Sequence, residues 1–497
     1  MPRNLQSQLL PAACDVRNID VFRARKTPEA VALQFEGCEV SYAKLSQLVT
    51  QLGILLTENK TDGYVVICMT NGLEPAVAYL ACLRYGIKFA IVHPDLDSET
   101  LAKVFGLISP WAVLTNATTY SKPDLGSFHK FQVNLDELEL HKQSADLEWI
   151  NSDNDHEAAV VFSSGSTGQP KGICHSYATL NALVDHSCLL YPSGIDLFSV
   201  PMAGLGGLQM LLTALALGKT TRLLASSRPD LIVDAIHTYL PERMLLFPAI
   251  IATLVAESRP DDAWVSKIKE CHSGGDSISS ALIETFHKLT GLIIQHAYGM
   301  AEFGVILKTS GQVGGPPTFN KLPTGHIKLY LLNDRNELAE PGEIGHLHVE
   351  STSLMKGYRL DRSIMDGESI IPPRIPFPTN DFFRLGQDGT YKYIGRENDL
   401  IKIRDDYISI KEIEYLLQAE SRCKNIVLFS NRLGELALCV QTSSRLSTEH
   451  QEEALQKAAE VALKPELHPK HIFFVDQLPL LGTTGKIDRQ KIAQLLG

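Results

Sequence analysis

The loop at residues 162–172, Phe-Ser-Ser-Gly-Ser-Thr-Gly-Gln-Pro-Lys-Gly, concentrates the residue types that bind phosphate. It follows the apolar run 158–162, which is typical of a buried strand. Small residues let backbone N–H groups close around phosphoryl oxygens, the serine and threonine hydroxyls add neutral donors, and Lys171 supplies a mobile positive charge. The sequence therefore predicts that this loop binds a polyphosphate nucleotide.

A Ser/Gly-rich run by itself is more often a surface loop, but the ending Pro170-Lys171-Gly172 favours the phosphate-binding interpretation. The loop lacks the Gly-Lys-Ser/Thr order of a Walker loop, in which lysine starts a helix. It also lacks the Gly-x-Ser-x-Gly pattern of a nucleophile elbow. The chemistry predicted from this loop is therefore phosphate binding of another kind.

Length and composition predict a globular protein of two or more domains, with small molecules or small proteins as its partners. The chain has 497 residues, 44% hydrophobic and 21% charged, with a formal net charge of -11. That charge argues against a nucleic-acid partner or an anionic membrane surface. Nine scattered cysteines without metal-ligand spacing, and a start without a signal-peptide core, predict a cytoplasmic protein with free thiols. The most apolar window, 200–218, contains four glycines and Gln209, so we expect no membrane span.

Alternating short apolar runs and helical patterns must position this loop. Residues 65–69 and 89–92 read as strands around a helix at 74–85, which predicts a layered α/β fold. From about residue 314 the segments become β-rich. The last hundred residues predict a separate small unit, with strands near 425–429, 435–441 and 471–475 and a helix at about 449–463 that begins with a capping box at 448–451. We place a domain boundary near residue 398.

Several further motifs follow in a fixed order along the chain. They read Val-Ser-Tyr-Ala-Lys-Leu at 40–45, Leu-Arg-Tyr-Gly-Ile-Lys-Phe at 83–89, Tyr-Gly-Met-Ala-Glu at 298–302, Thr-Asn-Asp at 379–381, Gly-Arg-Glu-Asn-Asp-Leu-Ile-Lys at 395–402 and Leu-Leu-Gly-Thr-Thr-Gly-Lys-Ile-Asp-Arg at 480–489. With the loop at 162–172 they resemble the ANL superfamily of adenylate-forming enzymes, which comprises acyl- and aryl-CoA ligases, adenylation domains of peptide synthetases, and luciferases. The resemblance extends over nearly the whole chain and is strongest to a stand-alone acyl- or aryl-CoA ligase.

The resemblance implies a fold and a set of site residues. It implies a large N-terminal α/β domain of several subdomains with a β-rich part, residues 1–398, and a small mobile C-terminal α+β domain, residues 399–497. It assigns adenine stacking to Tyr298, the ribose hydroxyls to Asp381, ribose or phosphate to Arg396, the hinge to Asn398, and the α-phosphate to Lys486. Glu302 and Thr167 would hold Mg²⁺, with Lys171 on the leaving pyrophosphate. The remaining implied nucleotide contacts are Ser163, Ser164, Gly165, Ser166, Gly168, Gly275, Asp276 and Gly299.

The resemblance also implies a reaction in two steps. ATP and Mg²⁺ would activate a small carboxylic acid as acyl-AMP with release of pyrophosphate, and the acyl group would pass to CoA or to the phosphopantetheine of an acyl carrier protein. Two residues depart from the family pattern. Ala301 replaces a threonine or serine, and Asp405 replaces a glycine near the pantetheine path. An amide-forming or adenylation-only enzyme, and a non-catalytic acyl- or nucleotide-binding protein, therefore remain alternatives.

The acyl pocket is predicted mainly by exclusion. Leu205 stands where amino-acid-activating domains place an aspartate, and Gly204 stands where many CoA ligases carry histidine. We expect an unusual aryl or medium-length acyl acid, or an acid already on a carrier, in secondary metabolism. The expected pocket residues are Gly204, Leu205, Phe247, Ser273 and Gly274. The sequence predicts neither the acid itself nor the oligomeric state.

Overall fold

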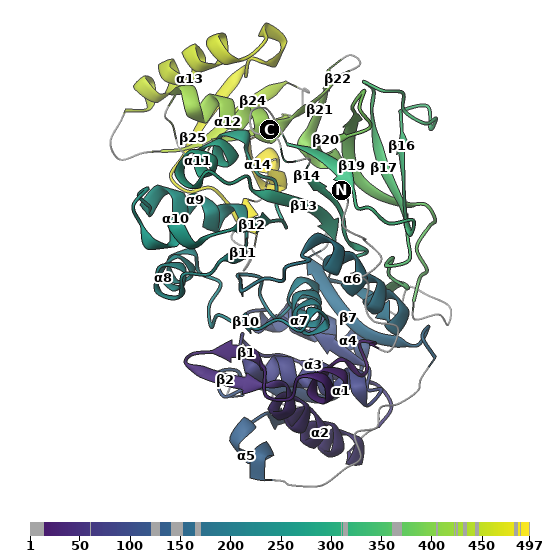
Figure 1. Cartoon of the computed structure of the whole chain (residues 1–497). Helices are drawn as coiled ribbons and strands as arrows, with labels where there is room; N and C mark the ends of the chain where they lie inside the picture. The colour runs from purple at the N-terminus through teal and green to yellow at the C-terminus, as the bar shows by residue number, and fades with distance from the viewer. Residues whose placement is uncertain are drawn as a thin grey trace. The chain divides into compact units, whose positions relative to one another are not determined.

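The chain forms two compact units in this computed structural model (Figure 1). The first comprises Met1–Leu329 with Val349–Pro378, and the second comprises Tyr330–His348 with Thr379–Gly497. The structure describes residues 14–59, 61–120, 130–140, 153–164, 170–309, 311, 317–359, 370–403, 406–421, 423, 426–430, 435–442, 447–481, 486–487 and 489–496. The domain boundary expected near residue 398 lies inside the second unit and stays a prediction.

Nine neighbouring strands of one large sheet belong to the first unit. In spatial order they are β15 (Thr318–Lys321), β14 (Gly304–Thr309), β13 (Gln295–Met300), β12 (Glu270–Ser273), β11 (Arg243–Leu246), β9 (Leu197–Phe198), β10 (Thr221–Arg222), β1 (Val31–Phe35) and β2 (Cys38–Ser41). From β13 to β1 every neighbouring pair is parallel, whereas β13–β14, β14–β15 and β1–β2 are antiparallel. The parallel strands therefore all end at one edge.

Four helices cover one face of this sheet beside β11 and β12 (Figure 1). They are α8 (Pro229–Tyr239), α9 (Pro248–Glu257), α10 (Ala263–Lys267) and α11 (Ser280–Thr290). Trp264 and Phe286 are fully buried in the apolar cluster between these helices and the strands, with ring centroids 6.5 Å apart. Such burial is the main stabilising contribution in a layered α/β unit.

A second sheet of seven strands carries the predicted phosphate loop. Its spatial order is β18 (Gly357–Arg359), β8 (Pro170–Ser176), β7 (Glu157–Ser164), β4 (Phe89–Ile91), β3 (Tyr64–Ile67), β5 (Pro110–Thr115) and β6 (Lys130–Gln132). The helices α2 (Tyr42–Glu58), α3 (Leu73–Arg84) and α4 (Ser98–Ile108) lie in the same part of the first unit. The strands predicted at 65–69 and 89–92 and the helix predicted at 74–85 correspond to β3, β4 and α3.

The second unit includes two longer β-hairpins and a small α/β layer. The hairpins are β19 (Phe377–Leu385) with β20 (Tyr391–Arg396), and β21 (Leu400–Ile403) with β22 (Asp406–Ser409). The layer has the order β23 (Ile426–Ser430), β24 (Leu436–Gln441) and β25 (His471–Val475). Helices α12 (Ile410–Ser421) and α13 (Thr448–Ala462) pack on one face of it, and Ile492 of α14 (Arg489–Leu496) packs on the other.

The fold expected from the sequence agrees with these elements, with one local correction. The helix predicted at about 449–463 is α13, but its capping box was predicted one residue too late. Ser447, not Thr448, is the N-cap, and its hydroxyl accepts a hydrogen bond from the backbone N–H of His450. Among the described residues, no helix is both long and apolar enough to cross a membrane.

Candidate active site

Most of the predicted pocket residues lie at the carboxyl ends of three parallel strands, β11, β12 and β13. Leu246 of β11 pairs with Ser273 of β12, which in turn pairs with His296 of β13, so these strands end together. Phe247, the glycines that follow Ser273, and Tyr298 come directly after those positions. Such an edge is where open parallel sheets bind ligands. The sheet topology therefore brings segments that are distant in sequence to one location.

A close approach of backbone fixes the segment from Tyr298 to Glu302. A Cβ atom on Gly299 would lie 2.2 Å from the carbonyl oxygen of Gly304, so no larger residue fits without a backbone shift. Ala301 is held from the other side, because the ring Nε2 of buried His175 lies 2.9 Å from its carbonyl oxygen and donates to it. Burial lowers the pKa of His175 to about 4, so the ring is neutral at pH 7.

One tyrosine, Tyr358, contacts both the carboxylate of Glu302 and the cation of Lys171 in the phosphate loop. The hydroxyl of Tyr358 donates a 2.8 Å hydrogen bond to Oε1 of Glu302, and Nζ of Lys171 lies 5.7 Å from the centroid of the Tyr358 ring. Glu302 is only 8% exposed. Burial, and then the Glu302 charge, raise the pKa of Tyr358, so its hydroxyl stays protonated. Two of the predicted catalytic residues are therefore brought together.

The loop itself is only partly described. Ser163 and Ser164 end β7 and pair with Lys171 and Pro170 of β8. The strands thus form a hairpin, and its connection must fall where the phosphate-binding residues were predicted. Gly165, Ser166, Thr167 and Gly168, as well as the side chains of Ser163 and Ser164, lie outside the described residues, so their assignments stay predictions.

The predicted acyl pocket includes residues from two segments, one around Phe247 and Gly275 and one around Gly204 and Leu205. Gly275 has φ +82°, and a Cβ atom there would lie 2.4 Å from the ring of Phe247, so this position requires glycine. Asp276 follows it and is exposed. Gly204 is the N-cap of α7 (Leu205–Leu217), and a Cβ atom on it would meet nothing within 4 Å. The space that a larger side chain would take beside Leu205 is therefore open.

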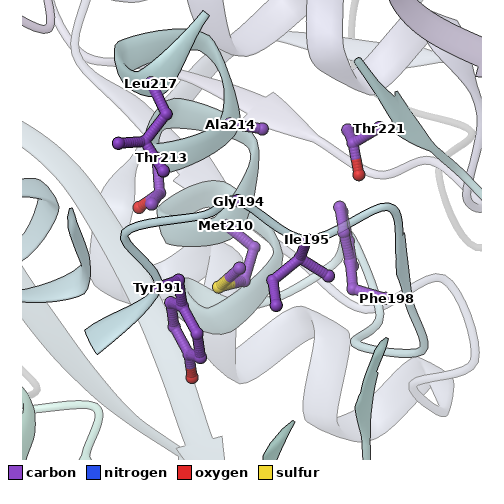
Figure 2. A pocket seen from close by; sticks show the side chains of 9 residues that line it. All are labelled: Tyr191, Gly194, Ile195, Phe198, Met210, Thr213, Ala214, Leu217 and Thr221. Carbon is purple, nitrogen blue, oxygen red and sulfur yellow. The ribbon is translucent and has the colours of Figure 1, made fainter. Parts of the chain in front are cut away.

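A separate apolar hollow lies beneath α7 (Figure 2). The space between its side chains is too narrow to admit a water molecule. Its lining residues are Tyr191, Gly194, Ile195, Phe198, Met210, Thr213, Ala214, Leu217 and Thr221. None of them is a predicted site residue, and we interpret the hollow as imperfect packing of the core.

In the second unit, Asp381 and Arg396, the two residues predicted to contact the ribose, lie on the paired strands β19 and β20. They face each other across β19 and β20, with Nε of Arg396 3.4 Å from Oδ1 of Asp381. The Asp381 side chain is 2% exposed and that of Arg396 is 61% exposed. Tyr393 donates a 3.4 Å hydrogen bond to the same carboxylate oxygen. Asn380, the residue before Asp381, has φ +58°, a conformation that asparagine tolerates.

The other predicted residues of the second unit are described only in their backbone. Lys486 lies in β27 (Lys486–Ile487), which pairs with β26 (Leu480–Leu481). Asn398 lies in the short 3₁₀ helix Glu397–Asp399 that precedes β21. The side chains of Lys486 and Asn398, and all of Asp405, fall outside the described residues. Their roles stay predictions.

The donor set fits Mg²⁺ that arrives with a nucleotide. Glu302 offers a hard carboxylate with one hydrogen-bonded oxygen, and magnesium in nucleotide sites typically takes one or two carboxylates together with phosphate oxygens and water. Across the described ranges, no group of three or more His, Cys, Asp or Glu side chains is arranged to hold a metal ion. A resident all-protein metal cage is therefore not seen in that part of the chain.

Comparison with known proteins decides the family. The family model for AMP-binding enzymes matches residues 22–359. The chain belongs to this family. These AMP-binding enzymes are part of the ANL superfamily of adenylate-forming enzymes, which confirms the predicted resemblance. The match ends at β18 and so includes the phosphate loop and the segment from Tyr298 to Glu302.

Individual relatives of this AMP-binding enzyme are distant. A linear gramicidin synthase from Brevibacillus parabrevis is 25% identical over 498 residues, which cover 95% of this chain but only 9% of that much longer protein. Amide bond synthetase McbA from Marinactinospora thermotolerans superposes with a TM-score of 0.75 at 20% identity, over 96% of this chain and 99% of its own. A benzoate CoA ligase from Burkholderia xenovorans LB400 gives 0.80 at 19% identity, over 97% and 100%. These structures confirm the fold of the enzyme.

Three residues that were not predicted from the sequence form hydrogen bonds to predicted site residues or to their neighbours. Tyr358 and His175 fix Glu302 and Ala301, and Tyr393 contacts Asp381. Tyr358 lies 56 residues from Glu302, and no motif marked it. His175 lies four residues after Lys171 in β8, so the two side chains share one face of the strand. This spacing was the signal in the sequence that placed His175 on the side of Lys171.

Proposed function

We propose that this AMP-binding enzyme activates a small carboxylic acid with ATP and Mg²⁺ and then transfers the acyl group to a thiol. The observation that carries the proposal is the arrangement of Lys171, Tyr358 and Glu302, which sets a cation and a hard carboxylate close together beside the phosphate loop. The family match to AMP-binding enzymes supports the same conclusion.

The first step joins two anions, so charge is its main barrier. A carboxylate oxygen attacks the α-phosphorus of ATP, the bond to the pyrophosphate oxygen breaks, and acyl-AMP forms. Bound Mg²⁺ would neutralise phosphate charge in this step. We assign Glu302 to hold it, Lys171 to the leaving pyrophosphate and Lys486 to the reacting centre. No general base is needed, because the attacking carboxylate is already ionised.

In the second unit we assign the ribose to Asp381. Its carboxylate accepts hydrogen bonds, so it suits two sugar hydroxyls as donors. Arg396 is more than half exposed and lies beside it, where a guanidinium can contact ribose or phosphate. Tyr298 in the first unit is assigned to the adenine face.

The second step replaces AMP by a thiol. The sulfur of CoA or of a carrier-protein phosphopantetheine attacks the acyl carbon, AMP leaves, and the thiol proton is released. Similarity to a benzoate CoA ligase supports this acceptor. Similarity to an amide bond synthetase favours one competing function, in which an amine attacks the same adenylate. The similarity to a gramicidin synthase keeps a carrier protein among the acceptors.

The acceptor is tested with preformed acyl-AMP, which bypasses the first step. The enzyme is mixed with an aryl-AMP and, in separate series, with CoA, a phosphopantetheinylated carrier protein or a primary amine. Thioester with CoA or carrier, above the rate without enzyme, supports the proposed function. Amide alone, or hydrolysis alone, would replace the thiol ligase by an amide ligase or an adenylation-only enzyme.

A further inference from the structure

Tyr358 contacts two side chains of opposite charge, Glu302 through its hydroxyl and Lys171 through its ring face. Its hydroxyl donates to the Glu302 carboxylate at 2.8 Å, and its ring lies 5.7 Å from Nζ of Lys171. Within the described part of the chain, neither Lys171 nor Glu302 forms an ion pair with another side chain. An aromatic face attracts a cation, and a phenol hydroxyl donates to an anion, so one side chain contacts both groups without neutralising either.

The strand that carries Tyr358 is firmly fixed. Tyr358 pairs with Ile173 of β8, and its backbone exchanges two 2.9 Å hydrogen bonds with Ile371. Neighbouring strand residues point to opposite faces, and Arg359 accordingly reaches other partners. Its guanidinium forms a 2.9 Å ion pair with Glu157 and a hydrogen bond to the Tyr64 hydroxyl.

We propose that Tyr358 is a positioning residue that keeps the Lys171 cation and the Glu302 carboxylate apart, so that each remains available to the magnesium–nucleotide complex. This inference rests on the proposed function. Without the tyrosine, the lysine and the glutamate would pair in a partly buried environment, where attraction is poorly screened. ATP and Mg²⁺ would then have to separate this pair before binding.

Two substitutions separate the roles of the ring and the hydroxyl. Tyr358→Phe keeps the ring beside Lys171 and removes only the hydrogen bond to Glu302. Tyr358→Leu removes both the ring and the hydroxyl. The readout is equilibrium binding of ATP to the full-length protein by calorimetry, with and without Mg²⁺, so no acid substrate is required. Thermal unfolding of each variant shows whether it is folded.

We expect graded losses in affinity. Tyr358→Phe should bind ATP normally without Mg²⁺ but about tenfold more weakly with it, because a hydrogen bond to a charged group is lost. Tyr358→Leu should bind ATP more weakly under both conditions, because Lys171 is paired. Adding Glu302→Gln to Tyr358→Leu should release Lys171 and restore the binding of ATP alone, an effect that a merely structural role would not produce.

Three results would overturn the inference. The first is a Tyr358→Phe or Tyr358→Leu protein that is folded and binds ATP with Mg²⁺ as well as, or better than, the wild type. The second is weak binding of ATP alone by Tyr358→Leu that Glu302→Gln does not restore. The third is a wild-type protein that does not bind ATP at all, which would overturn the proposed function as well.

Discussion

At the scale of single residues, Glu302 is the side chain on which the proposed chemistry depends most. It is 8% exposed, and its carboxylate accepts from Tyr358, while its backbone carbonyl accepts a 2.7 Å hydrogen bond from the N–H of Met355. Both backbone and side chain are therefore held before any ligand arrives. Preorganised charge of this kind is what electrostatic catalysis requires.

Glu302→Gln should slow adenylation by about 10²-fold or more, because the amide is a poor magnesium ligand but keeps the size and the hydrogen bond from Tyr358. The measurement is acid-dependent pyrophosphate release at a series of Mg²⁺ concentrations. Glu99→Gln on α4, an exposed residue paired with Lys103, is the matched control and should be unchanged. Equal rates for Glu302→Gln and the control would remove Glu302 from the site.

Motif order in the sequence predicted Lys171, Glu302, Asp381 and Arg396 as site residues. In the structure Lys171 and Glu302 each contact Tyr358, and Arg396 lies beside Asp381, while their roles in binding and catalysis stay predictions. Motif order was not sufficient to predict Tyr358. That contact depends on the antiparallel pairing of β18 with β8, which joins segments far apart in the chain. Pairing of this kind leaves no local pattern, because each short strand is equally compatible with several neighbours.

At the scale of elements, the antiparallel pair β13 and β14 carries both Tyr298, in β13, and Glu302, in the turn that follows β13. The pairing has a register shift between Tyr298 and Gly299. The shift lies just beyond His296, which pairs with Ser273 at the end of β12. The exact positions of the aromatic ring and the carboxylate therefore depend on a close approach between two backbone segments.

Gly299→Ala should destabilise the protein by roughly 1–3 kcal/mol and weaken ATP binding, because the new Cβ atom would lie 2.2 Å from the Gly304 carbonyl oxygen. Chemical denaturation and ATP binding measure the two effects. Gly325→Ala is the matched control, since a Cβ atom there meets nothing within 4 Å. If Gly299→Ala behaves like this control, the close approach does not constrain the site.

Elements were predicted well where apolar runs are buried on both faces, as in β3, β4, β23 and β24. Element ends were predicted less well. β10 ends at Arg222, although Leu223 is buried and its backbone N–H still donates to the carbonyl of Gln34 in β1. A buried apolar residue just beyond a strand continues the apolar pattern of that strand, so the sequence alone does not fix where the strand ends.

At the scale of the whole molecule, three buried histidines link stability to pH. Burial lowers the pKa of His175, His186 and His296 to about 4 each. In the unfolded chain they titrate near pH 6.5. Between pH 6.5 and 4 the unfolded state therefore binds more protons than the folded state, and the free energy of unfolding falls as the pH is lowered.

In that pH window, each of these histidines should contribute at most about 1.4 kcal/mol per pH unit to the slope of the unfolding free energy against pH. His175→Gln keeps a donor for the Ala301 carbonyl and removes one titrating group. Its slope between pH 6.5 and 4, measured by denaturant titration, should be shallower than that of the wild type by about this amount. An unchanged slope would mean that His175 is already protonated in the folded protein.

The identity of the acid and the acceptor lies beyond what the sequence and the fold predict. Relatives of the same fold include an amide bond synthetase and a benzoate CoA ligase, at 20% and 19% identity. A shared fold carries many chemistries. We expect differences in the predicted pocket, such as Gly204 and Leu205, to determine the substrate.

The most direct test of the central claim is pyrophosphate release from ATP and Mg²⁺ across a panel of aryl and acyl acids, for the wild type and Lys486→Ala. We predict release that requires an acid and that falls by orders of magnitude in the variant, while thioester formation from preformed acyl-AMP persists. Measurable ATP binding without acid-dependent release from any acid of a broad panel, including carrier-bound acids, would contradict the claim and favour a non-catalytic nucleotide-binding protein.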